Sequence, residues 1–435
     1  MNNLFNFIDS RLSRRAEFSL SKVQLRPDQS LPQVFPNYAD LEGFYRLIKN
    51  PRIDMRDIMN DISLNTLSHC SSLEEFAVLH DTTFVNPKSN IRSNFIGRRG
   101  LMTHLSLAVS TSSSPQVYGA LNLDFIERTK AGKKAIDEPE SSRWIKSVKE
   151  CEGRISNTNC IHIMDREGDF FENIYELATN NIRFVVRACH NRPVKNSLEG
   201  KLFDILKNRS SVVSLEAKIS KREENSFKNK KISKIHPKRD ARLSSLSVSS
   251  EVCTFYNPRA KKEDRKECSV NVIRVWEHNP PNEVEPIEWF LITSENVGLK
   301  EDIKKVVNLY RRRWLIEEYF KGLKTGCKLE EKQFEDIQSW KKLIAFYLQV
   351  TTSILNLRVL DKVCLESLKE KPSDDQIAIL KAATKTDIKD SESLLYAIAK
   401  LGGHIKYNGP PGWQVLHRGM KQLYNLEEGW RLRCD

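Results

Sequence analysis

Two acidic residues end short apolar runs of the kind that forms buried strands. The run at 76–81 ends on Asp81, and the run at 160–165 ends on Asp165. If the two strands lie parallel and adjacent, both carboxylates reach one edge of a sheet, where open α/β folds place their sites. Mg²⁺ prefers such hard carboxylate ligands and keeps positions open for water and phosphate oxygens. For each aspartate taken alone, the alternative is a residue that only caps the next turn.

A third carboxylate lies in a pattern typical of one long helix over 301–324. At about 100° per residue, Arg313, Glu317 and Lys324 fall within about 60° of Tyr310 on one stripe. The adjoining, core-facing stripe is apolar and consists of Leu309, Ile316, Phe320 and Leu323. Glu317 therefore lies between cations on a partly buried face, which suits a site for metal and phosphate. The alternative is an amphipathic helix whose charges are solvated or paired with one another.

The elements that would position these residues follow a mixed α/β order. Strand patterns at 76–81, 101–110 and 115–125 precede a helix near 139–154, a strand at 160–165, a helix and a strand at 182–188. The polar turn between the second and third strands favours an antiparallel hairpin. This order predicts a mixed sheet with helices packed on it. The histidines beside the two aspartates, His80 and His162, are expected on the opposite side of their strands; the alternative for His80 is contact with a metal-bound water.

Charge and composition narrow the class of protein. The chain has 435 residues, with 70 Lys and Arg against 57 Asp and Glu, a formal charge of +13. Such an excess of positive charge on a folded chain points to a polyanionic partner. The basic stretch at 218–242 is either a loop that contacts DNA or a loop that is only solvated. No apolar run is long enough to span a membrane, and no signal peptide is evident, so a cytoplasmic protein is expected. The nine scattered cysteines contain no C-x-x-C pair and read as reduced thiols.

The spacing Tyr310-x(2)-Arg313-x(3)-Glu317-x(6)-Lys324 resembles the Y-R-E-K signature of bacterial insertion-sequence transposases, the cut-and-paste DDE enzymes of the IS-four family. Further agreement with that family is found in HDTT at 80–83, MDREGDFFE at 164–172, FYRLIKNPRI at 44–53 and PPGWQVLHRGMKQL at 410–423. The resemblance covers most of the chain. One departure is the short segment before FIDSRLSRR, which implies a minimal end-binding domain or a displaced start.

The resemblance implies an RNase-H-like catalytic fold that is interrupted by a β-rich insertion and flanked by helical N- and C-terminal regions. Asp81, Asp165 and Glu317 would be the catalytic and metal-binding triad, with Mg²⁺, or Mn²⁺ in its place, as cofactor. The partners would be double-stranded DNA, both transposon terminal inverted repeats and target, and a second copy of the chain in the DNA complex. The reaction would cleave transposon ends through a hairpin intermediate and join them to target DNA.

The same resemblance assigns DNA contacts to four residues. Trp289 would stack on a flipped base during hairpin formation, because unstacking a base requires a few kcal/mol that an aromatic platform can offset. Tyr310, Arg313 and Lys324 would hold adjacent phosphates. Without the resemblance, a core tryptophan and ordinary surface charges are the expected roles.

Five regions follow from these patterns. They are an N-terminal end-binding region (1–70), the first part of the catalytic domain (71–189), the β-rich insertion with its basic loop (190–288), completion of the catalytic domain (289–360) and a dimerising C-terminal region (361–435). Two rival functions stay open. One is a catalytically idle DNA-binding derivative, which the intact acids disfavour. The other is a metal nuclease that cuts without joining, which Trp289, Arg313 and Lys324 disfavour.

Overall fold

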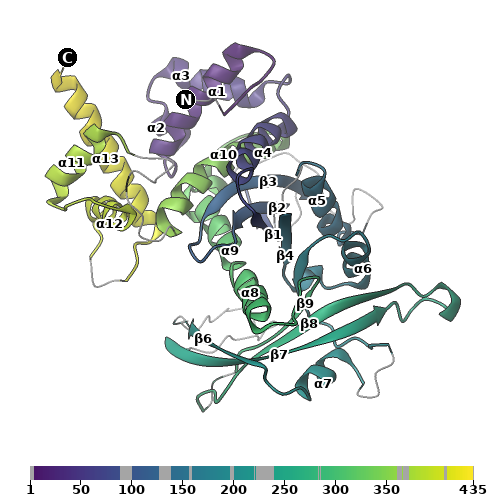
Figure 1. Ribbon diagram of the computed structural model, residues 1–435. Helices are drawn as coiled ribbons and strands as arrows, with labels where there is room; N and C mark the ends of the chain where they lie inside the picture. Colours follow the sequence, from purple (N-terminus) through teal and green to yellow (C-terminus); the bar gives the residue numbers. More distant parts are fainter. Residues whose placement is uncertain are drawn as a thin grey trace, which may run out of the picture. The chain divides into compact units, whose positions relative to one another are not determined.

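The computed structural model describes residues 4–88, 100–126, 139–155, 159–195, 200–219, 221, 240–282, 284, 286–359, 365, 372–405 and 409–434. The chain divides into two compact units (Figure 1): Met1–Cys160 with Trp314–Asp435, and Ile161–Arg313. None of the helices in the described ranges is long and apolar enough to cross a membrane. Most of the basic stretch at 218–242 lies outside these ranges.

The first unit contains three antiparallel strands and most of the helices. Strands β1 (Glu75–Val85), β2 (Leu101–Ser110) and β3 (Val117–Ile126) pair in the order β3-β2-β1. Helices α4 (Met55–Cys70), α5 (Ser142–Glu152) and α10 (Ile337–Val359) pack against them. The expected hairpin over 101–125 is confirmed, as is the helix near 139–154.

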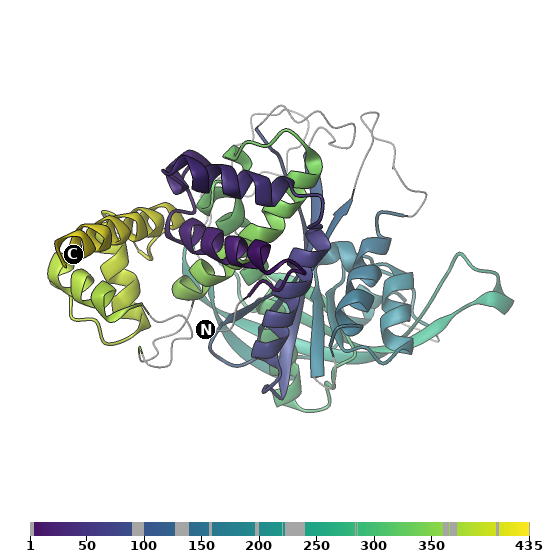
Figure 2. The same cartoon turned by 90° about the horizontal axis from the view of Figure 1, so that it is seen from above.

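Helices form the two ends of the same unit. Of the N-terminal helices, α1 (Ser10–Leu25) and α3 (Tyr38–Lys49) lie beside α10, as Figure 2 shows, and α2 (Leu31–Val34) contacts α3. The C-terminal helices α11 (Asp374–Thr384), α12 (Ser391–Leu401) and α13 (Trp413–Cys434) form their own group with a common apolar core. Between these ends run α9 (Trp314–Lys321) and a turn of π-helix at Gly322–Gly326.

The second unit holds a mixed sheet in the order β4-β5-β9-β8-β7-β6. Its strands are β4 (Asn159–Met164), β5 (Phe184–Arg187), β6 (Val213–Ile219), β7 (Arg242–Tyr256), β8 (Glu267–Glu277) and β9 (Glu288–Thr293). Within this unit β4 and β5 are parallel, and the pairs β5–β9, β9–β8, β8–β7 and β7–β6 are antiparallel. Helices α6 (Phe171–Thr179), α7 (Leu202–Lys207) and α8 (Lys300–Arg311) complete the unit. The expected α/β class, a mixed sheet with flanking helices and helical termini, is confirmed.

Two expectations about the elements are wrong. Strand β1 does not end at Asp81 but continues to Val85, because Thr82 to Val85 are β-branched or aromatic and pair with β2. The single helix over 301–324 is interrupted after Arg311, where the amides of Arg312 and Arg313 bond to the carbonyls of Leu309 and Tyr310, three residues back.

Candidate active site

Asp81 lies in the middle of β1, half-buried, opposite Leu105 of β2. Side chains alternate along a strand, so Asp81 and Thr83 share one face while His80 points to the other. His80 is fully buried and its Nδ1 lies 3.0 Å from Ser106 Oγ, which confirms the expected orientation of this histidine. The Nζ of Lys324 donates to Thr83 Oγ1 at 2.5 Å. Lys324 therefore reaches the face of β1 that carries Asp81.

The ammonium of Lys324 is half-buried against this face. Burial lowers its pKa, while the carboxylates of Glu330 and Asp81 act in the opposite direction. Asp81 is thus close enough to stabilise the charged form of the lysine. A cation held beside a carboxylate on a partly buried surface can neutralise a phosphate that approaches the same carboxylate.

The position of Lys324 depends on the π-helical turn at Gly322–Gly326. Its closing bond runs from the Cys327 amide to the Gly322 carbonyl, five residues back, at 2.7 Å. Both glycines face the indole of Trp413 on α13: a Cβ at Gly322 would lie 2.6 Å from a ring carbon, and one at Gly326 would lie 3.0 Å away. The absence of side chains at the two glycines therefore lets Trp413 pack closely against the turn that carries Lys324.

Glu317 is exposed on α9, and the apolar stripe expected beside it is buried, at Leu309, Ile316, Phe320 and Leu323. The next residue has a different role. Glu318 pairs with Arg358 and with Lys321 and accepts from Trp413 Nε1 at 3.4 Å. Burial acts to raise the pKa of Glu318, but Arg358, Lys321 and Trp413 together outweigh it and hold that pKa below its usual range. Glu318 therefore fixes α9, and Glu317 lies on the exposed side of this helix.

Asp165 directly follows β4, as expected, and belongs to the second unit. It is half-buried, and its Oδ1 accepts from the Glu167 amide at 2.8 Å, so it also caps the short turn that follows. Asp81 and Glu317 belong to the first unit. The three candidate carboxylates are thus divided between the two units of the chain.

Sequence reasoning missed the role of Asp169, four residues after Asp165. This carboxylate is buried, binds the Arg192 guanidinium and accepts from the amides of Cys189 and His190 at 2.6 and 2.9 Å. It fastens the loop after β4 to the segment after β5. The ligand atoms of Asp169, Cys189 and His190 lie within 4.8 Å of one another, a spacing that suits a metal ion. However, Asp169 already forms an ion pair with Arg192. In addition, burial raises the pKa of Cys189 to about 11, which disfavours the thiolate that a metal ion would need.

Trp289 lies in the second unit at the start of β9, paired with Val275 of β8. It is half-buried, unlike Trp144 and Trp340, which are completely buried core residues. Its ring meets that of Tyr310 edge-on, with centroids 5.7 Å apart and planes at 64°. The structure thus brings two of the four expected DNA-contacting residues together within one unit.

The second unit also carries a surface hollow rich in hydrogen-bond donors. Its lining includes Lys300, Lys304 and His278 together with serines at 211, 214, 245 and 247, and no carboxylate is among the residues that line it. Such a lining is complementary to phosphate.

Comparison with known proteins agrees with these features. Residues 3–53 match the family "Transposase DNA-binding", and residues 139–348 match the family "Transposase DDE domain". The two matches support a DNA-binding DDE transposase, and DDE domains generally use divalent metal ions. The observed α/β fold is consistent with the RNase-H-like fold of such domains. Among solved structures, the chain matches the cryo-EM structure of the piggyBac transposase synaptic complex with hairpin DNA at 11% identity and TM-score 0.37, covering 100% of this chain and 75% of that one.

Proposed function

We propose that the chain is a cut-and-paste transposase of the IS-four type that cleaves transposon ends through a hairpin intermediate and joins them to target DNA. Asp81, Asp165 and Glu317 are its catalytic carboxylates. It acts on paired terminal inverted repeats as a homodimer, in the bacterial cytoplasm. The observation that carries the proposal is the contact between Lys324 and β1, because it places a signature cation on the strand face of Asp81.

The donor set of these carboxylates fits a divalent metal. All three are hard oxygen ligands, and none is fully buried: Asp81 and Asp165 are half-buried and Glu317 is exposed. When bound, Mg²⁺ or Mn²⁺ would supply Lewis-acid stabilisation of charge on the reacting phosphate. Glu318, although adjacent, is unsuited because Arg358 already engages it.

The signature residues act on the DNA itself. Lys324 and Arg313 neutralise phosphates, and the Tyr310 hydroxyl orients one of them. Trp289 presents an aromatic surface at the start of β9, on which a flipped base can stack, with the Tyr310 ring supporting its edge. A nuclease that only hydrolyses its substrate has no need of a stacking platform, which favours the transposase over that rival.

The proposal is tested with a labelled duplex that carries the inverted repeats flanking the gene, incubated with Mg²⁺ and resolved on denaturing gels. Wild-type protein should give a hairpin-ended product. Glu317→Gln should abolish cleavage and leave end binding nearly intact, because the amide keeps the shape of the side chain and removes the charged ligand. Equal loss of binding and cleavage in Glu317→Gln would contradict the catalytic role. Specific binding by the wild type without cleavage would favour the idle derivative.

A further inference from the structure

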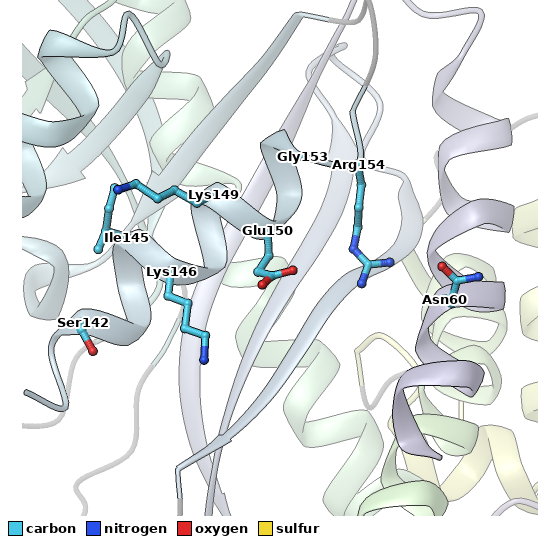
Figure 3. A pocket seen from close by; sticks show the side chains of 8 residues that line it. All are labelled: Asn60, Ser142, Ile145, Lys146, Lys149, Glu150, Gly153 and Arg154. Carbon is cyan, nitrogen blue, oxygen red and sulfur yellow. The ribbon is translucent and has the colours of Figure 1, made fainter. Parts of the chain in front are cut away.

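A groove between α4 and α5 has a lining that nothing in the proposed catalytic chemistry uses. We name it the α5 groove; its polar lining residues are Asn60, Ser142, Lys146, Lys149, Glu150 and Arg154. Figure 3 shows Lys146, Lys149 and Glu150 on α5, with Arg154 between that helix and Asn60 of α4. All six belong to the first unit.

The groove follows from the pattern of α5. The residues at 143, 144, 147, 148 and 151 are buried, and those at 142, 145, 146, 149, 150 and 153 line the groove. Intervals of three and four residues place the second set along one side of the helix. This side is about 16 Å long at about 1.5 Å per residue, which matches about five base-pair steps of about 3.4 Å.

Arg154 fixes the far wall of the groove. Its Nη1 donates to Ser63 Oγ of α4 at 2.7 Å, so the guanidinium is held across the space between the two helices. Lys146 and Lys149 are exposed and leave α5 in different directions, so their ammonium groups lie apart from each other (Figure 3). Among the described residues that line the groove are three cations and one carboxylate, and the amide of Asn60 and the hydroxyl of Ser142 add neutral donors.

We propose that the α5 groove binds the phosphate backbone of duplex DNA, independently of sequence. The inference rests on the proposed function, and α5 lies inside the segment that matches the transposase DDE domain. Phosphate contacts from lysine, arginine, serine and asparagine position a protein on DNA without reading bases. Separated cations with a net positive charge fit a regular row of phosphates better than they fit a single compact anion.

The test is the salt dependence of binding to a labelled duplex that lacks the inverted repeats, measured by fluorescence anisotropy. Each phosphate contact adds about 0.9 to the slope of log K against log salt. Lys146→Gln combined with Lys149→Gln should therefore reduce the slope by about 2. The fall in affinity from about 50 to about 200 mM salt should become about tenfold smaller than in the wild type. Arg154 is left intact because its bond to Ser63 supports the fold.

Two controls separate the groove from general effects. Glu150→Gln removes the one acid in the groove and should strengthen binding, whereas a folding defect would weaken it. Lys381→Gln with Lys385→Gln removes two exposed lysines at α11 and should leave the slope unchanged. An unchanged slope in the groove variant, or an equal reduction in the α11 variant, would overturn the inference. Tighter binding to single-stranded RNA, with the same residues responsible, would show that duplex DNA is the wrong occupant.

Failure of the groove is distinguishable from failure of the proposed function. If the wild-type protein cleaves the transposon ends with Mg²⁺, and the groove variant keeps the wild-type slope of log K against log salt, only the assignment of the groove is wrong. If the wild type neither binds duplex DNA nor cleaves it, both fall together.

Discussion

Lys332 is a buried lysine whose titration can be followed in the stability of the protein. Its side chain is 3% exposed, and its Nζ donates to the carbonyls of Pro27, at 3.0 Å, and Gln29. Burial lowers the pKa of Lys332 from 10.5 to about 8. The contact ties residues 27–29, inside the segment that matches the transposase DNA-binding family, to the chain just after the π-helical turn.

The shift predicts a pH dependence with a definite sign. The folded pKa lies below the unfolded one, so the folded protein releases this proton at lower pH than the unfolded chain does. Burial of the charge therefore destabilises the fold fully below pH 8, and the penalty is relieved as the pH rises from about 8 to about 10.5. A shift from 10.5 to about 8 corresponds to about 3 kcal/mol at about 1.4 kcal/mol per unit.

The assay compares wild type with Lys332→Met, which keeps the apolar length of the side chain and cannot titrate. Urea unfolding is followed by tryptophan fluorescence at intervals between pH 7 and pH 10. The unfolding free energy of the wild type, relative to Lys332→Met, should rise by about 2.5 kcal/mol from pH 7 to pH 10, since the last part of the rise lies above pH 10. Cys327 lies nearby but stays neutral in this range, because burial raises its pKa to about 12.

A flat difference between the two proteins from pH 8 to pH 10 would refute the reasoning, because it would mean that Lys332 titrates as a solvated lysine. A difference that falls with pH would have the wrong sign. Lys146→Met, which removes an exposed lysine from α5, controls for the loss of one positive charge.

Three further predictions follow from the site. Gly322→Ala should lower the unfolding free energy by about 1–3 kcal/mol, because its Cβ would lie 2.6 Å from the Trp413 ring; thermal melting measures this. Trp289→Ala should leave nicking intact and slow hairpin formation about tenfold or more, as loss of about 1–3 kcal/mol of stacking implies; an unchanged hairpin rate on time-resolved gels would contradict the role. Asp81→Cys should be inactive with Mg²⁺ and partly active with Mn²⁺, because a thiolate is a softer ligand; cleavage assays in each metal decide it.

The sequence predicted what depends on local patterns. Apolar periodicity placed the strands and the buried stripe of α9, and the alternation of β1 placed His80 away from Asp81. The position of Asp165 just after β4 also followed from its apolar run. These features depend on neighbours within about ten residues, and side-chain periodicity records them directly.

The features that the sequence did not predict depend on contacts between distant segments. No glycine or proline marks the interruption after Arg311. The orientation of α9 is instead set by Glu318 with Arg358 and by the Tyr319 hydroxyl, which donates to the Leu348 carbonyl at 2.6 Å. Likewise, Asp169 gains its role only once Arg192 reaches it from beyond β5. Such partners lie tens of residues away, so no local pattern contains them.

The interruption changes what the spacing of the signature residues means. On one straight helix, Tyr310, Arg313, Glu317 and Lys324 would share a face because of their angular positions. In the structure the first pair and the second pair belong to different units, and Lys324 itself lies within the π-helical turn Gly322–Gly326. A single helical wheel therefore does not describe all four residues, because the helix is interrupted after Arg311. The first interval sets the number of residues between Tyr310 and the start of α9. The second sets the number between Glu317 and the turn that packs against Trp413. The contact of Lys324 with β1 depends on this second number.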